Sequence, residues 1–287
     1  MERRPYGNTG EQLSIIGFGG ILVMGEPQSQ ADRAVAEAID RGINYFDVAP
    51  SYGDAEERLG PALEGRRDRV FLACKTTKRS KEEAANELRQ SLKRLRTDHV
   101  DLYQLHAMTT EDDFRQATGP GGALEAFVEA REQGLVRYIG FSAHSVEVAL
   151  KLLDTFDFDS ILFPVNWVNY FNTDFGPQVV AKAQEKGVAR LALKAMAKTV
   201  RGDRKHREAY PKAWYEPIGT DEPDLAELAL RFTLSQPVTA AIPPGERDLF
   251  EMALKFAERF RPLSDGELEE LKRRAQGLAP IFHYPAA

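Results

Sequence analysis

Four side chains that could move or position a proton lie in or just after apolar, strand-like segments in the first third of the chain. The segments are residues 43–48, 70–76 and 100–106, which carry Asp47, Lys75 and His106, and Tyr52 follows Asp47 by five residues. Adjacent parallel strands are about 4.8 Å apart. If these segments are neighbouring strands, we expect the four side chains to share one sector of the sheet's edge.

Such a group suits the delivery of a proton to a carbonyl oxygen while a hydride reaches the carbonyl carbon. A free tyrosine has a pKa of about 10 and is a poor acid near neutrality. A nearby Lys75 ammonium would stabilise the Tyr52 phenolate, and a buried Asp47 would keep that lysine charged. His106 could donate a hydrogen bond to the same oxygen or relay a proton. Each residue alone would more often be structural, so the prediction rests on their joint placement.

The segments that must position these residues alternate between strand and helix along the whole chain. The expected strands are residues 15–20, 43–48, 70–76, 100–106, 136–141, 160–166, 189–195 and 239–242. The expected helices are residues 30–41, 56–64, 81–96, 123–133, 146–156, 177–186, 224–236 and 249–260. Eight such units in about 250 residues predict a (β/α)₈ barrel. A doubly wound open sheet is the alternative, although no G-x-G-x-x-G follows the first strand.

Two further pieces lie outside the repeat, and one connection is unusually long. Residues 4–14 predict a short hairpin at the N-terminal end of the barrel, and residues 267–276 predict an extra C-terminal helix. Residues 197–223 form a connection that is long for a compact domain, with a basic run at residues 201–207. We predict that this segment is a lid over substrate and cofactor. No linker interrupts the pattern, which predicts one domain over residues 1–287.

The composition limits the classes of function that the protein can have. The chain has 38 Lys and Arg residues against 44 Asp and Glu residues, a net charge of −6, which disfavours a nucleic-acid or anionic-membrane partner. No stretch is long and apolar enough for a membrane span or a secretion signal. The single Cys74 fits a reducing compartment and is expected to be buried against the helices. We therefore expect a cytoplasmic protein that acts on a small molecule, and the histidine spacing indicates no metal site.

Several sequence motifs, and their order along nearly the whole chain, resemble those of the aldo-keto reductase family. FDVAPSYG at residues 46–53, followed by Glu57 and Gly60, resembles the family signature F-D-x-A-x-x-Y-G-x-E-x-x-x-G. Lys75, DLYQLH at residues 101–106, RYIGFS at residues 137–142 and FPVN at residues 163–166 resemble its later motifs.

The resemblance implies a (β/α)₈ barrel that reduces an aldehyde or ketone with NADPH, with NADH left open. Tyr52 would be the general acid, supported by Asp47 and Lys75, and His106 would orient the carbonyl. The implied cofactor-binding residues are Gly20, Ile21, Asp47, Ser142, Leu193, Lys194, Met196, Pro243, Gly245, Glu246 and Arg247. The residues expected at the substrate are Tyr52, His106, Trp167, Trp214 and Tyr215.

Several positions depart from the family pattern. Three common nicotinamide contacts are replaced by Ala143, Leu162 and Leu193, and the usual phosphate-binding positions hold Pro244, Phe250 and Leu254. Arg247 remains for a 2′-phosphate, whereas Glu246 could accept from a ribose hydroxyl. These departures keep open a non-catalytic, nucleotide-binding regulatory or interaction subunit. A Schiff-base aldolase using Lys75 is a third possibility, which an adjacent Asp47 disfavours.

Overall fold

The computed structural model describes residues 1–202 and 204–285, without the side chains of residues 204–206, and its centre is one parallel sheet of eight strands. In sheet order the strands are β12 (Ala240–Ala241), β9 (Ala189–Leu193), β8 (Ser160–Pro164), β7 (Val136–Ala143), β6 (Val100–Met108), β5 (Phe71–Thr76), β4 (Tyr45–Asp47) and β3 (Phe18–Gly19). The sheet closes next to β3 and β12. There Ala241 N donates to Ile15 O (2.8 Å) and Gly17 N donates to Ala241 O (2.9 Å). The predicted barrel is therefore confirmed.

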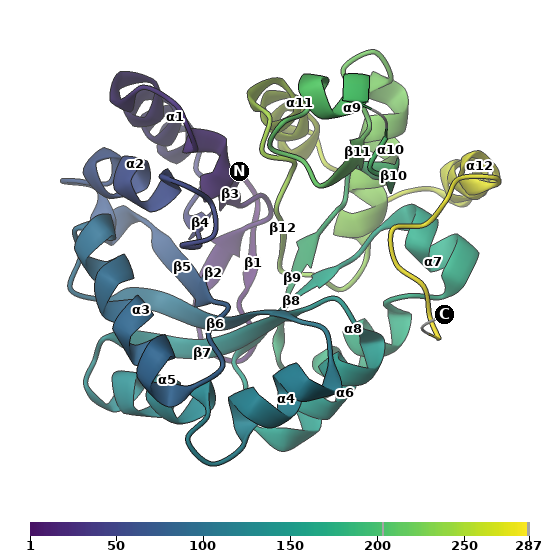
Figure 1. Cartoon of the computed structure of the whole chain (residues 1–287). Coiled ribbons are helices and arrows are strands. Elements are labelled where there is room, and N and C mark those ends of the chain that lie inside the picture. The colour runs from purple at the N-terminus through teal and green to yellow at the C-terminus, as the bar shows by residue number, and fades with distance from the viewer. Residues whose placement is uncertain (203, 286–287) are drawn as a thin grey trace.

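A helix follows each strand and packs outside the barrel, as Figure 1 shows. These helices are α1 (Gln28–Asp40), α2 (Ala55–Ala62), α3 (Lys81–Leu95), α5 (Ala123–Glu132), α6 (Val146–Thr155), α8 (Pro177–Glu185), α10 (Pro223–Ser235) and α11 (Arg247–Glu258). All eight overlap the helices expected from the sequence. β3 and β12 are only two residues long, and an isolated bridge between these two edges joins Ile16 and Ala241.

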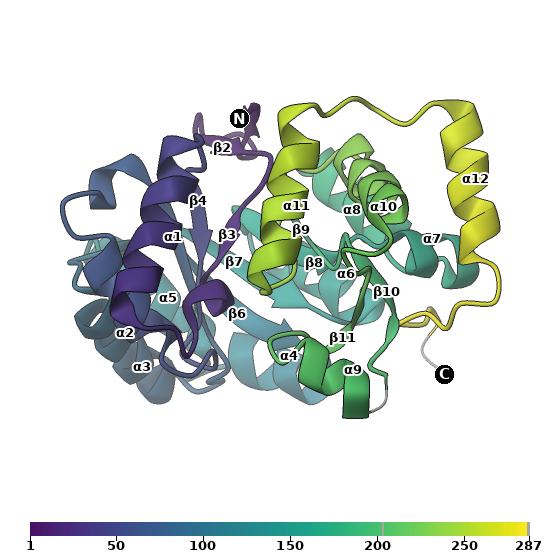
Figure 2. The same cartoon turned by 90° about the horizontal axis from the view of Figure 1, so that it is seen from above.

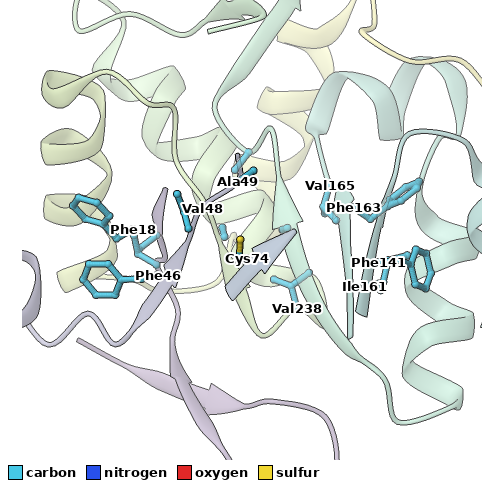
Figure 3. Packing of buried hydrophobic residues seen from close by; sticks show 14 of the residues in the cluster. Phe18, Phe46, Val48, Ala49, Cys74, Phe141, Ile161, Phe163, Val165 and Val238 are labelled. Carbon is cyan, nitrogen blue, oxygen red and sulfur yellow. The ribbon is translucent and has the colours of Figure 1, made fainter. Parts of the chain in front are cut away.

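The hydrophobic residues form an inner and an outer layer. A smaller cluster fills the barrel interior, with Leu102, Leu162 and Leu191 among its members. A larger cluster lies between the strands and the helices. Figure 3 shows part of that outer layer, including Cys74 and the stacked rings of Phe18 and Phe46. Successive strand residues point to opposite faces, so Cys74 packs toward the helices, as predicted, while Lys75 enters the barrel.

The pieces outside the repeat are also present, together with helices that were not predicted. β1 (Arg3–Pro5) and β2 (Gln12–Ser14) form the expected antiparallel hairpin, and α12 (Asp265–Ala275) is the expected extra helix. The unexpected helices are η1 (Gly20–Val23), η2 (Arg67–Arg69), α4 (Glu111–Thr118), α7 (Trp167–Thr173) and α9 (Arg204–Ala209). α4 begins with a Thr110–Asp113 capping box, and the Asn166 side chain caps α7. The two capped helices lie in segments without long apolar periodicity, so the apolar pattern of the sequence did not predict them.

The long connection after β9 has structure of its own. β10 (Ala197–Val200) and β11 (Tyr215–Pro217) pair antiparallel, with α9 between them. Figure 2 shows this excursion projecting beside the barrel, apart from α12, which packs beside α7. The predicted basic run falls partly outside the described residues. Among the described helices, none is both long enough and apolar enough to cross a bilayer.

Candidate active site

A buried ion pair lies at the base of the site. Asp47 and Lys75 come from the neighbouring strands β4 and β5, are 2% and 1% exposed, and their carboxylate and ammonium groups are in direct contact. The other Asp47 oxygen accepts from the Tyr45 hydroxyl (3.3 Å) and from Gln104 Nε2 (3.2 Å). A buried carboxylate needs such partners to stay ionised. Asp47 is therefore held in one position beneath the mouth of the barrel.

Lys75 keeps its charge in spite of its burial. Burial favours the neutral amine, but the charge of Asp47, together with Tyr52, outweighs it, so the pKa of Lys75 lies above its ordinary value. The ammonium also lies 5.1 Å from the centre of the Tyr52 ring. The site thus places a fixed positive charge beside a phenol.

Tyr52 sits on the turn between β4 and α2 and reaches over the ion pair. It is 9% exposed. Burial raises the pKa of Tyr52, and Lys75 opposes that rise through its charge and a hydrogen bond. The phenol is therefore protonated at neutral pH. Proton loss from the hydroxyl would place the phenolate beside the Lys75 ammonium, which is what a proton donor in this position needs.

His106 faces Tyr52 edge-on. The two ring centres are 6.0 Å apart and their planes are nearly perpendicular. Burial lowers the pKa of His106 to about 2, and the charges of Lys75, His144, Arg79 and Lys194 act in the same direction. His106 is thus neutral at physiological pH. A neutral imidazole can donate a hydrogen bond to a carbonyl oxygen, but it is not an acid in this range.

The pocket beside this group opens at the carboxyl ends of the strands, where barrels carry their active sites. Its volume is about 470 Å³, including the part open to solvent. The lining residues are Gly19, Ile21, Asp47, Tyr52, Leu193, Lys194, Lys212, Trp214, Tyr215, Ile242, Pro243, Pro244 and Gly245. Of the four predicted catalytic residues, Asp47 and Tyr52 line this pocket together with most of the expected cofactor and substrate residues, whereas Lys75 and His106 are not among its lining residues.

Four expected contacts lie elsewhere. Trp167 is fully buried and its indole N–H donates to Ala197 O (3.0 Å). It therefore supports the segment after β9 and does not line the pocket. Ser142 is buried and its hydroxyl accepts from Ala107 N (2.8 Å). Met196 is fully buried, and Gly20 is packed against Val48. None of the four lines the pocket, because each is engaged in local packing or hydrogen bonding.

The two residues at the start of α11 also have partners. Glu246 Oε1 accepts from Lys212 N (2.7 Å), and Arg247 Nη2 lies 3.2 Å from Glu37 Oε2 of α1 in an exposed pair. Phe250 and Leu254, expected at the usual phosphate-binding positions, are buried, and Phe250 packs against Phe18. Neither side chain is therefore available to contact a phosphate.

The structure adds residues that were not predicted. Tyr45 and Gln104 contact Asp47 and precede Asp47 and His106 by two positions each. Alternate residues of a strand share a face, so the period of two could have identified both. Lys212 donates through its ammonium to Leu22 O and to Glu26 Oε1, both at 2.8 Å. It lies in an irregular loop, where no sequence period gives such a signal.

Comparisons with known proteins agree with this geometry. Residues 15–273 match the model of the aldo/keto reductase family. The chain is 27% identical over 304 residues to the uncharacterized oxidoreductase YqkF of Bacillus subtilis (strain 168), with 95% of this chain and 96% of that protein covered. It is also similar to the solved holo form of the aldo-keto reductase AKR11C1 from Bacillus halodurans. That likeness has a TM-score of 0.75 and 25% identity and covers 99% of each chain.

An eight-stranded barrel with a pocket at the carboxyl ends of its strands is the architecture of a barrel enzyme. The chain belongs to the aldo/keto reductase family. Membership implies the reduction of a carbonyl group in a small molecule with a nicotinamide cofactor.

Proposed function

We propose that this protein reduces an aldehyde or ketone with NADPH, with Tyr52 as the general acid. The observation that carries the proposal is the Asp47–Lys75 ion pair buried beneath a protonated Tyr52 at the pocket. An ion pair that only stabilised the barrel would not need a phenol above it. General acids of this kind contribute about 10²–10⁴-fold to a rate.

The residues around the pocket fit a nicotinamide cofactor. A Cβ at Gly245 would lie 2.4 Å from Ile21 Cγ2 and 3.3 Å from Lys212 Cβ, so only glycine lets the loop after β12 approach η1 and Lys212 this closely. Ile21, Leu193 and Ile242 offer an apolar surface for a flat ring, and Lys212 offers a cation at the same pocket. When bound, the cofactor supplies the hydride for the reduction.

The side chains of the chain do the remaining work. Tyr52 donates its proton to the carbonyl oxygen, and Lys75 stabilises the phenolate that remains. Asp47 holds Lys75 charged and in place. His106 donates a hydrogen bond that fixes the direction of the carbonyl, and Trp214, whose ring lies 6.0 Å from that of Tyr52, shields the reacting atoms from water.

The two other candidate functions differ in what they require of these residues. A Schiff-base aldolase would need a neutral Lys75 amine, whereas the charge of Asp47 raises the pKa of Lys75. A non-catalytic nucleotide-binding subunit agrees with the replaced nicotinamide contacts at Ala143, Leu162 and Leu193. It gives no reason for the complete group of Asp47, Tyr52, Lys75 and His106, so we favour the reductase.

The preference for NADPH is expected to depend on Arg247. Its present partner Glu37 forms an exposed ion pair, a type that contributes about 0–1 kcal/mol, so Arg247 can exchange it for a 2′-phosphate. A charge-assisted hydrogen bond of about 1.5–3 kcal/mol corresponds to about 10- to 150-fold in affinity. Arg247→Ala should weaken NADPH by that factor and leave NADH nearly unchanged in a fluorescence titration.

Glu37→Gln is the matched variant for this prediction. It removes the competing carboxylate and leaves Arg247 in place, so NADPH should bind slightly more tightly than to the wild type while NADH does not change. Equal losses of NADPH and NADH affinity in Arg247→Ala would show that Arg247 does not contact the 2′-phosphate. A wild-type preference for NADH would instead favour Glu246 as the ribose contact.

The loop at Lys212 is expected to limit cofactor exchange. Its ammonium joins the loop to η1 through Leu22 O and to the turn before α1 through Glu26, and its backbone N–H joins the loop to Glu246. Lys212→Met keeps a long, unbranched side chain but loses the two hydrogen bonds of the ammonium, each worth about 1 kcal/mol. We expect the dissociation rate of NADPH in stopped-flow fluorescence to rise at least about fivefold. An unchanged rate would show that this contact is not part of a lid.

The experiment that tests the proposed function directly is cofactor titration followed by a substrate panel. NADPH and NADH are titrated by protein fluorescence, and oxidation of the preferred cofactor is then followed with a series of aldehydes and ketones. Cofactor-dependent turnover supports the reductase. Tight binding of either nucleotide without turnover on any carbonyl compound would support the non-catalytic subunit instead.

A further inference from the structure

Lys194 is a cation in the pocket that the chemistry at Tyr52 does not use. It follows β9 directly and lines the pocket. Its backbone is left-handed, with a φ of 66°, a conformation that side chains other than glycine rarely adopt. Its carbonyl is held there by Asn166 Nδ2 (2.9 Å) and by Ala197 N (3.0 Å). The fold therefore fixes a strained backbone at the position that carries this ammonium.

The ammonium of Lys194 lacks an acidic partner among the described residues. Its neighbours are aromatic: Nζ lies 4.4 Å from the centre of the Tyr215 ring and 5.6 Å from that of Trp214. Burial lowers the pKa of Lys194 to about 8, and no other group counters that shift. Two aromatic rings thus compensate its burial only in part. An anion bound in the pocket would supply the missing counter-charge.

The position of Lys194 favours the substrate over the cofactor as the source of that anion. Its charge lowers the pKa values of both His106 and His144, so it acts on the side of the pocket where the carbonyl is oriented. Lys212, by contrast, packs next to Gly245 and Ile21. Trp214 lies within about 6 Å of both the Tyr52 ring and the Lys194 ammonium. One small molecule can therefore reach both groups.

His144 offers a second polar group on the same side. Its Nε2 is buried without a hydrogen-bond partner among the described residues, and its ring stacks on Phe282 of the C-terminal segment, with the ring centres 5.2 Å apart. Burial lowers the pKa of His144 to about 4, so the ring is neutral and can donate one hydrogen bond.

We propose that Lys194 binds a carboxylate carried by the carbonyl substrate, and that the substrates are oxo acids whose carbonyl and carboxylate lie several bonds apart. This inference rests on the proposed reduction at Tyr52. The carbonyl oxygen lies at Tyr52 and His106, and the carboxylate lies at Lys194 beneath Trp214 and Tyr215. The surplus positive charge of the pocket also attracts such substrates over neutral ones.

The test compares two aldehydes that differ by one charge: 4-carboxybenzaldehyde and its methyl ester. Wild-type protein should have the higher kcat/KM for the acid. Lys194→Met should reduce the acid-to-ester ratio of kcat/KM by about 10- to 150-fold, the value of a charge-assisted hydrogen bond. Lys194→Arg should restore much of the ratio, because it keeps the charge.

The matched control is Lys198→Met in the same segment. Lys198 already has a carboxylate partner, Glu222, at 2.5 Å, so its loss should leave the acid-to-ester ratio at the wild-type value. A ratio that stays unchanged in Lys194→Met overturns the proposal. So does a fall in NADPH and NADH affinity at an unchanged ratio, which would place Lys194 on the pyrophosphate of the cofactor.

A binding measurement separates this proposal from the proposed reductase activity. Trp214, one of two tryptophans in the chain, lies beside Lys194 and should report binding of 4-(hydroxymethyl)benzoate by a change in fluorescence. The affinity should fall at least about tenfold in Lys194→Met, while that of the neutral methyl ester changes less. If the wild type reduces no aldehyde or ketone of the substrate panel but shows this dependence, the anion site stands and the reductase is wrong. Equal affinities in wild type and variant overturn the site.

Discussion

Tyr52→Phe should lower the turnover of carbonyl reduction by about 10²–10⁴-fold and leave the affinity for NADPH nearly unchanged. The variant removes one hydroxyl group, which is the proton donor in the proposed mechanism. The ring stays, so its packing against His106 and Trp214 is kept. Steady-state kinetics with an activated aldehyde, together with a cofactor titration, measure both quantities.

The control for this variant is Tyr45→Phe. Tyr45 is fully buried and its hydroxyl donates to Asp47 at 3.3 Å, so the same atom is removed from the floor of the site and not from the pocket. We expect a smaller loss of turnover than in Tyr52→Phe. Wild-type turnover in Tyr52→Phe would show that another group delivers the proton.

Lys75→Met should have the second largest effect, and it should act on activity and stability together. Without the ammonium, the pKa of Tyr52 rises further, because an opposite charge nearby shifts a pKa by about 1–3 units. A weaker acid donates its proton less readily, so turnover falls. Asp47 also loses its ionic partner, and breaking a buried pair in this way costs about 3–5 kcal/mol of unfolding free energy. Kinetics and thermal unfolding measure the two effects.

A double variant distinguishes a role through Tyr52 from general damage to the barrel. If Lys75 acts by stabilising the phenolate, Tyr52→Phe with Lys75→Met should be hardly slower than Tyr52→Phe alone. If the losses of turnover in the two single variants multiply in the double variant, Lys75 contributes independently of Tyr52. Asp47→Asn completes the series: it keeps the volume of the side chain, removes the charge that holds Lys75 protonated, and should lower both the Tm and the turnover.

The barrel could be predicted from the sequence because its signals are local and repeated. Each buried strand is a short apolar run, and each helix carries an apolar face with the helical period, as in α3 with Ala84, Leu88 and Leu92. The predicted ends of the strands were less accurate. β3 and β12 are shorter than the segments predicted for them, since the hydrogen bonds that close the barrel depend on the position of the partner strand and not on local sequence.

The floor of the site was predictable for a related reason. Asp47 and Lys75 occupy strands that follow each other in the chain and pair in the sheet, so their proximity follows from the fold. The contacts of the segment at residues 197–223 were not predictable in detail. The contacts of Lys212 with Glu26 and Glu246 join segments far apart in the sequence, and Trp167, expected at the substrate, is buried instead because its indole supports Ala197.

The proposed activity is the transfer of hydrogen from a nicotinamide cofactor to a carbonyl carbon. The most direct measurement is incubation of the wild-type protein with NADPH deuterated at both C4 positions of the dihydronicotinamide and with 4-nitrobenzaldehyde, phenylglyoxal or 4-carboxybenzaldehyde, followed by mass spectrometry of the alcohols. We expect one deuterium on the carbinol carbon, and a rate that falls by about 10²–10⁴-fold in Tyr52→Phe. NADPH that binds but leaves no deuterium in any alcohol would contradict the proposed activity.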